Sequence, residues 1–127
     1  HLVFDVKHDG RHKARMVADG HGTKVPLESV YSGVVSICSI RLVTYLPEHF
    51  GHELWATDIG NAYLESKTKE KLAIMAGPKF GKEREGHVLI VYKALYGLRT
   101  SGKRWHEMLS DCMRQLRFEP CRTNPSI

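Results

Sequence analysis

Segments with strand-like and helix-like apolar spacing alternate along this chain, and their order leaves few folds open. Residues 2–7 and 13–18 are extended runs on either side of an Asp-Gly turn dipeptide, which predicts a β-hairpin. Residues 72–75 and 87–92 are a second pair of extended runs, separated by a Gly/Lys/Glu loop, and they predict another hairpin. Strands joined in this way pair antiparallel.

Two further stretches have the spacing of amphipathic helices. The apolar stretch at residues 34–46 has helical spacing and predicts a helix with Ser36 as the N-cap and Gly51, a few residues beyond Pro47, closing it. A second helix is predicted from Ser101, also as an N-cap. Its apolar positions are Trp105, Met108, Leu109, Cys112 and Leu116, and its polar face holds Lys103, Arg104, Asp111 and Arg114.

One short segment between the first helix and the second hairpin is predicted to be a buried strand. Residues 54–59 are apolar at alternate positions and lie between Gly51 and Gly60, and Asp58 comes near their carboxy end. The predicted order is therefore hairpin, helix, strand, hairpin, helix. This order is typical of an α+β fold with mostly antiparallel pairing.

Composition and length favour one globular unit, or a piece of one, with a polyanionic partner. The 127 residues carry 19 Lys and Arg against 14 Asp and Glu, a formal charge of +5 that favours nucleic acid. The three cysteines lack CxxC spacing, and no run approaches the roughly 20 apolar residues of a membrane helix. The chain begins without Met inside an apparent strand and stops without a terminal element, so we expect a piece of a longer protein.

The segment from Thr57 to Leu64 holds the densest group of residues suited to chemistry. Asp58 follows an apolar run and is itself followed by Gly60 and small residues, through which a ligand could reach the backbone. Two-metal phosphoryl transfer needs such a carboxylate, and Tyr63 could pack against a sugar. The alternative is ordinary: Asp58 caps the following turn and Tyr63 fills the core.

Basic and aromatic residues form two other candidate sites. Lys13 and Arg15 alternate on a strand and so share a face, as a triphosphate clamp would require, although solvated charges are the alternative. Residues 93–105 combine aromatic, Gly and basic side chains in a mixture suited to contacts with a nucleic-acid strand. The eight histidines show no third ligand at a recognisable spacing, so we interpret them as surface residues.

Several of these segments together, in order, resemble the reverse transcriptases of Ty1/copia retrotransposons. The matching segments, each with the family's own block in parentheses, are residues 13–18 (KARLVA), 40–42 (IRLL), 58–64 (DVKTAFL), 93–99 with Arg104 and Trp105 (KALYGLKQAPRQWY) and, loosely, 118–127 (GFxxSxxDxxxF). One block would be a weak match. The ordered set over nearly the whole chain is a strong one.

The resemblance implies a partial right-hand polymerase fold. Residues 1–53 would be the fingers hairpin and helix, and residues 54–127 a palm segment that stops before the family's Asp-Asp hairpin. The implied activity is RNA-directed DNA polymerisation by two-metal nucleotidyl transfer, with magnesium as the cofactor or manganese in its place. Asp58 alone cannot hold two metals, so we expect this segment by itself to be inactive.

The resemblance also implies a role for each site residue. Asp58 would be catalytic, and with the Ile59 carbonyl it would bind metal. Tyr63 would be the steric gate against a ribose 2′-hydroxyl. The other nucleotide-binding residues would be Lys13, Arg15, Gly60, Asn61 and Ala62, and the residues near template and primer would be Tyr96, Gly97, Arg99, Lys103 and Arg104. We expect Asp58, Tyr63 and the Lys13/Arg15 pair to share a cavity.

The implied partners are an RNA template, a DNA primer, deoxynucleoside triphosphates and the rest of a polyprotein, with integrase upstream and RNase H downstream, and no membrane. The implied location is a cytoplasmic retrotransposon particle, or the nucleus. Residues 100–102 replace the family's QAP, and Asn124 replaces an Asp. These departures leave open a second hypothesis, a non-catalytic nucleic-acid-binding remnant. A third, a metal hydrolase built on Asp58, needs a histidine within reach of it.

Overall fold

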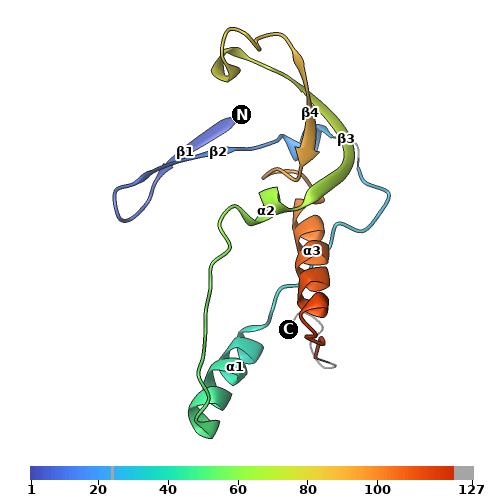
Figure 1. Cartoon of the computed structure of the whole chain (residues 1–127). Coiled ribbons are helices and arrows are strands. Elements are labelled where there is room, and N and C mark those ends of the chain that lie inside the picture. The colour runs from blue at the N-terminus through green and yellow to red at the C-terminus, as the bar shows by residue number, and fades with distance from the viewer. Residues whose placement is uncertain (24, 122–127) are drawn as a thin grey trace.

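The computed structural model describes residues 1–23 and 25–121. Figure 1 shows the elements, which in chain order are β1 (Leu2–Val6), β2 (His12–Met16), η1 (Gly20–Gly22), α1 (Ile37–Phe50), α2 (Ala62–Glu65), β3 (Lys67–Met75), η2 (Pro78–Phe80), β4 (Val88–Lys93) and α3 (Ser101–Gln115). The strands form two separate antiparallel pairs, β1–β2 and β3–β4. The predicted α+β class with antiparallel pairing is confirmed. Asn124 and the end of the last matching block lie outside the described residues.

The first hairpin forms as predicted. Its turn places Gly10 at φ +80°, in the left-handed region that glycine adopts without steric cost. The Lys7 amide donates to the Arg11 carbonyl at 2.9 Å and closes the turn. In the register of the two strands, Lys13 lies opposite Asp5 and Arg15 opposite Val3. Lys13 and Arg15 are two residues apart on β2, so they share one face.

The first predicted helix is also confirmed, with the predicted residues at both of its ends. The Ser36 side chain accepts a hydrogen bond from the Ser39 amide at 3.1 Å, and Gly51 ends the helix in the left-handed conformation. The helix runs through Pro47 to Phe50 and stops at the predicted closing residue, Gly51. None of its residues is buried, and α1 stands apart from the two hairpins and α3 (Figure 1).

The predicted buried strand at residues 54–59 is wrong. This segment is an exposed, extended connection between α1 and α2 (Figure 1), and 85% of Trp55 is accessible to solvent. An extended segment needs a neighbour to satisfy its amides and carbonyls. In the described part of the chain β1 pairs with β2 and β3 with β4, and neither sheet takes a third strand.

The second hairpin and α3 form the packed part of the molecule. β3 begins at Lys67, five residues before the predicted start at residue 72, and its even-numbered residues from Thr68 to Ile74 lie on the less exposed face. The α3 helix packs against α2 and β3. The buried residues there are few and, apart from Leu98 and Arg104, small: Ser66, Ala76, Ala94, Leu98, Thr100, Ser101 and Arg104.

Two details of α3 differ from the sequence-based predictions. Its N-cap is Thr100, and Ser101 is the first helical residue. The Ser101 hydroxyl donates instead to the Leu95 carbonyl at 2.6 Å and ties the helix to the preceding turn. Arg104, predicted on the solvated face, is 3% exposed because acidic side chains surround its guanidinium. None of the described helices has the length and apolar content needed to cross a membrane.

Candidate functional site

Two tyrosines from different motifs meet beside the start of α3. Tyr63 lies on α2 and Tyr96 lies in the turn before α3, and their ring centroids are 5.0 Å apart with the planes inclined by 44°. Both side chains are partly buried. A Cβ on Gly102 of α3 would come within 3.9 Å of the Tyr63 hydroxyl, so the helix packs closely behind the pair. The structure thus brings together one predicted sugar-contacting residue and one predicted template-contacting residue.

The backbone leading to Tyr63 is open. Asp58 is exposed and makes no hydrogen bond or ion pair within the described part of the chain. No atom would crowd a Cβ on Gly60 within 4 Å. Asn61 adopts a left-handed conformation at φ 54°, one that Asn tolerates better than most residues, and its carbonyl accepts from the Leu64 amide at 2.7 Å. A free carboxylate and an uncrowded backbone therefore precede the tyrosine pair in the chain.

The donors at this position are of the right type for a hard divalent cation. The Asp58 carboxylate and the Ile59 carbonyl are oxygen donors, which magnesium and manganese prefer. Among the described residues, no three His, Cys, Asp or Glu side chains gather closely enough to hold a metal ion. Asp58 and Ile59 therefore fit one edge of a coordination sphere, and the described residues do not complete a two-metal centre.

Of the basic pair on β2, Lys13 lies in a surface hollow on the first hairpin and Arg15 lies beside Asp5. Lys13 lines a hollow on the first hairpin with Asp5 and His12, and Arg15 Nη1 is 3.7 Å from Asp5 Oδ2. Asp58 is not among the residues that line this hollow. The expected grouping of Lys13 and Arg15 with Asp58 stays a prediction.

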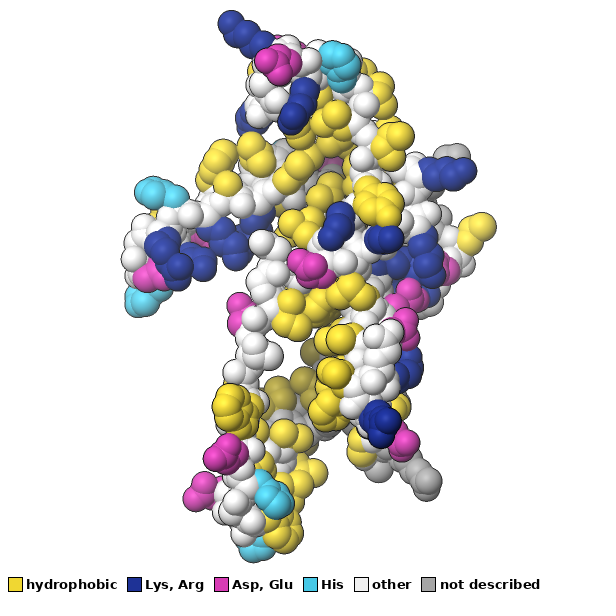
Figure 2. Space-filling model, in the orientation of Figure 1, with side chains coloured by type: hydrophobic (Ala, Val, Ile, Leu, Met, Phe, Trp, Pro, Cys, Tyr) yellow, Lys and Arg dark blue, Asp and Glu magenta, His cyan; other side chains and the backbone are white. Residues whose placement is uncertain are grey.

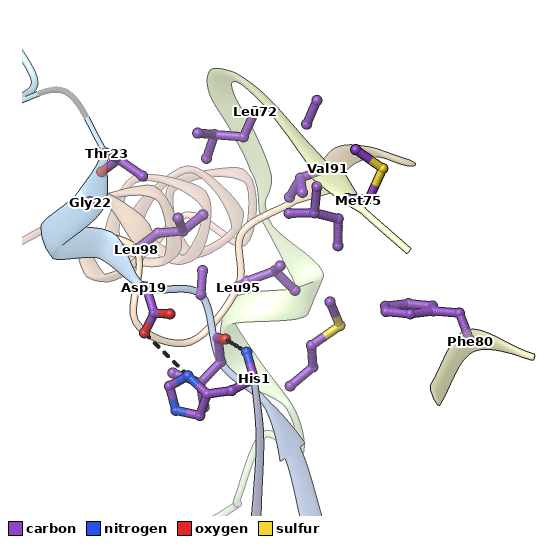
Figure 3. A pocket seen from close by; sticks show the side chains of 15 residues that line it. His1, Asp19, Gly22, Thr23, Leu72, Met75, Phe80, Val91, Leu95 and Leu98 are labelled. Carbon is purple, nitrogen blue, oxygen red and sulfur yellow. Dashed lines mark hydrogen bonds and ion pairs between the residues drawn. The ribbon is translucent and has the colours of Figure 1, made fainter. Parts of the chain in front are cut away.

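A cavity of about 380 Å³ opens between residues 16–23 and the β3–β4 hairpin (Figure 3). Its walls are mostly aliphatic, with Leu72, Val91 and Leu95 among them, and Phe80 stands at one side. None of the predicted site residues lines it. The cavity therefore adds no member to the candidate site.

The predicted template-contacting turn also joins the two halves of the chain. Val17 and Tyr96 form an isolated parallel bridge, and the Ala18 amide donates to the Tyr96 carbonyl at 2.7 Å. Arg99 Nε donates to the Gly20 carbonyl at 2.9 Å. A Cβ on Gly97 would clash with Ala18, so only glycine permits this approach. Gly97 and Arg99 therefore hold the end of the first hairpin against the start of α3.

Lys103 and Arg104, the last predicted template contacts, belong to an ion-pair cluster with two acids. Arg104 pairs with Glu28 through Nη2, and its Nη1 donates to Glu107 at 2.8 Å. Lys103 Nζ is 3.1 Å from Glu28. The Arg104 guanidinium lowers the pKa of Glu107 below its usual value, chiefly through this hydrogen bond. The acids thus neutralise both cations.

Sequence reasoning missed both acids. The pairing of Glu107 with Arg104 could have been predicted, because Glu107 lies three residues after Arg104 on a helix and such positions are neighbours. The pairing of Glu28 with Arg104 could not have been predicted, because the two residues are 76 positions apart in the chain and meet only in the folded state. Arg104 Nε is buried without a hydrogen-bond partner among the described residues.

Comparisons with known proteins agree on one family. The family model described as "Reverse transcriptase (RNA-dependent DNA polymerase)" matches residues 1–127. The Transposon Ty1-DR4 Gag-Pol polyprotein of Saccharomyces cerevisiae is 34% identical over 119 residues, which cover 90% of this chain and 7% of that protein. The Transposon TyH3 Gag-Pol polyprotein, also from Saccharomyces cerevisiae, is 34% identical over 119 residues, 90% of this chain and 6% of that protein. No solved structure matches this chain.

Proposed function

This chain belongs to the reverse transcriptase (RNA-dependent DNA polymerase) family, as a segment of a Ty1/copia-type polymerase, and we propose that it supplies the fingers and upper palm. In this proposal residues 1–53 are the fingers and residues 54–127 are the palm segment of a right-hand polymerase. The chain spans about 7% of the length of the curated relatives that it matches. The complete catalytic centre therefore needs residues from outside this segment.

The contact between Tyr63 and Tyr96 is the observation that carries the proposal. These residues are far apart in the chain, and their rings lie 5.0 Å apart. Aromatic rings are side chains on which nucleic-acid bases stack. Two such rings from distant segments meet here, and the free carboxylate of Asp58 precedes Tyr63 by five positions in the chain.

In the proposed mechanism each side chain binds or orients. Tyr63 fills the space that a ribose 2′-hydroxyl would need, and Lys13 and Arg15 neutralise the triphosphate. Asp58, with the Ile59 carbonyl, would hold divalent metal, which the family generally uses and which would neutralise charge on phosphate oxygens. No atom lies within 4 Å of the place of a Cβ on Gly60, so phosphate oxygens could approach the backbone there, and the amides of residues 60–62 would receive them.

The remaining contacts extend to the template and to the rest of the protein. Tyr96, Gly97 and Arg99, with the more shielded Lys103 and Arg104, would lie near the template and the nascent base pair. The matched relatives are named Gag-Pol polyproteins. We therefore propose an RNA template, a DNA primer and deoxynucleoside triphosphates as substrates. Integrase upstream, RNase H downstream and a cytoplasmic particle or nuclear location complete the proposed setting.

The direct test is an Asp58→Asn variant of the polymerase region that contains this segment, measured by primer extension on RNA. Loss of the carboxylate should lower incorporation by about 10³-fold or more, the scale seen when one transition-state contact is removed. Binding of the primed template should stay within about twofold, because Asp58 touches no template in this proposal. Asp111→Asn is the matched control, since Asp111 is an exposed acid on α3 that pairs with Arg114. An Asp58→Asn variant that extends primers at the parental rate would remove Asp58 from the catalytic centre.

A non-catalytic nucleic-acid-binding remnant is the second candidate. It is favoured by the position of Asp58 on an exposed connection instead of a strand that would hold it rigidly. The primer-extension assay distinguishes this candidate from the polymerase. A parent that binds primed RNA and extends no primer supports the remnant, and extension that depends on Asp58 supports the polymerase.

A further inference from the structure

The end of the β3–β4 hairpin next to α2 carries four exposed lysines and an exposed tyrosine that the proposed site does not use. Lys67, Lys69 and Lys71 are all exposed and alternate along β3 with less exposed residues, in the stretch where the pairing with β4 is irregular. Lys93 of β4 lies opposite Lys67 in the sheet register. Tyr92 is 60% exposed, and Lys67 Nζ lies 5.2 Å from the centre of its ring. We call these five residues the lysine face.

The charges of the lysine face are more available than those of Lys103 and Arg104. Both of the latter are paired with Glu28 and Glu107, and Arg104 is 3% exposed. On β3 the intervening acid, Glu70, lies on the opposite side of the strand and accepts from the Thr100 hydroxyl.

Lys69 and Lys67 of the lysine face each make a contact that leaves the positive charge of the lysine available to a ligand. Lys69 Nζ is 3.8 Å from Glu107, but the lysine side chain is 71% exposed, so water screens the pair. The neighbouring Tyr92 raises the pKa of Lys67 above its usual value, mainly through a side-chain hydrogen bond. Figure 2 shows Lys and Arg side chains gathered near the junction of β3 with α2 and α3.

The spacing of these lysines suits a phosphate backbone. Residues two apart on a regular strand are separated by about 6.6 Å, and the pairing with β4 is irregular between Lys67 and Leu72, so Lys67 and Lys71 are at most about 13 Å apart. A stacked nucleic-acid strand advances about 3.4 Å per nucleotide, so this span covers up to about four nucleotides. An exposed tyrosine beside a row of cations is the combination that holds single strands, because bases stack on the ring while phosphates meet the charges.

The lysine face also begins beside the candidate site. α2 ends at Glu65, and its C-cap Ser66 is followed at once by Lys67. The Ala94 amide donates to the Ser66 carbonyl at 3.0 Å, which holds the end of β4 to the same point. A strand lying across the lysine face would therefore lead toward the Tyr63–Tyr96 pair.

We propose that the lysine face binds the sugar–phosphate backbone of a single-stranded nucleic acid, with Tyr92 stacking on one base. The binding itself follows from the charge and spacing of these residues. The identification of this bound nucleic acid as the template next to the polymerase site rests on the proposed function.

The test compares two triple variants of the full chain by fluorescence anisotropy with a labelled single strand of about 12 nucleotides, enough to span the face. One variant is K67Q/K69Q/K71Q. The matched control, K79Q/K82Q/R84Q, removes the same charge from the exposed loop at the other end of the hairpin. Losing three single-strand phosphate contacts should lower the slope of log affinity against log salt by about 2, since each contributes about 0.7. The control should keep the parental slope.

Three further measurements keep the outcome unambiguous. K67R/K69R/K71R should bind as the parent does, because the charges remain, and circular dichroism checks that each variant folds. Acylation of lysines in the parent chain, read by mass spectrometry, should show the single strand protecting Lys67, Lys69 and Lys71 but not Lys79 or Lys82. A duplex of the same length should protect them less. Equal loss of slope in both glutamine variants, or equal protection of all lysines, would overturn the proposal.

This test is independent of turnover. An Asp58→Asn chain should bind the single strand as tightly as the parent. Failure of the polymerase assignment therefore leaves the binding result intact, and failure of the lysine face leaves the role of Asp58 intact.

Discussion

Replacing Gly97 with alanine should destabilise the chain more than any other glycine change in a turn. Gly97 has φ +87°, and an L side chain at such an angle costs about 1–2 kcal/mol. The new Cβ would lie 2.7 Å from Val17 Cγ1 and would overlap the Ala18 carbonyl. Relieving that overlap must move the two backbones apart and lose the 2.7 Å bond from the Ala18 amide to the Tyr96 carbonyl, worth about 1 kcal/mol. The expected loss is about 3 kcal/mol of unfolding free energy.

Alanine substitutions at two other glycines measure the backbone strain and the steric clash separately. Gly10→Ala has the positive φ without any neighbour within 4 Å, so it should cost only the backbone term of about 1 kcal/mol. Gly20→Ala lacks the positive φ, but its Cβ would overlap the Gly97 carbonyl, so it reports the clash alone.

Urea unfolding followed by circular dichroism gives the three free energies. Amide hydrogen exchange at Ala18 shows whether the joint itself has opened. If Gly97→Ala costs no more than Gly10→Ala, or if Ala18 keeps its protection, the close approach does not hold the two halves together. A Gly97→Ala chain that is fully stable but binds template poorly would instead make Gly97 a ligand contact alone.

Three other predictions concern single side chains. In the polymerase region that contains this segment, Tyr63→Ala should raise ribonucleotide incorporation relative to deoxyribonucleotide incorporation by about 10- to 100-fold. Tyr45→Ala is the control. Unchanged sugar discrimination in Tyr63→Ala would remove the gate assignment. Lys13→Ala should raise KM for the nucleotide by about 10-fold with little change in kcat, since one charged contact is lost, and steady-state kinetics in which only kcat falls would contradict this. The pKa of Glu107 is lowered from its ordinary value of 4.5 by Arg104, so its contribution to stability is present above pH 4.5 and is lost as pH falls through the folded-state pKa. Urea unfolding at several acidic pH values should therefore show a weaker decline for Glu107→Gln than for the parent.

The local elements were predictable because each depends on neighbours in the chain. The Asp-Gly turn of the first hairpin, the Ser36 cap with the Gly51 terminator, and the periodic apolar face of α3 are signals confined to a few turns or residue pairs. The family could also be identified from the order of short blocks, and the comparisons confirm it.

Tertiary packing decided what the local pattern could not. Residues 54–59 have the alternation of a strand, but a strand forms only when another segment offers its hydrogen bonds, and in the described chain none does. Arg104 has the helical position of a solvated residue, yet Glu28 reaches it from a distant loop and keeps it buried. The pairing of Tyr63 with Tyr96 likewise depends on how α2 meets the turn before α3. Local sequence therefore specifies most of the elements and the family, while long-range contacts between chain segments decide which charged and aromatic side chains are exposed, paired or brought together.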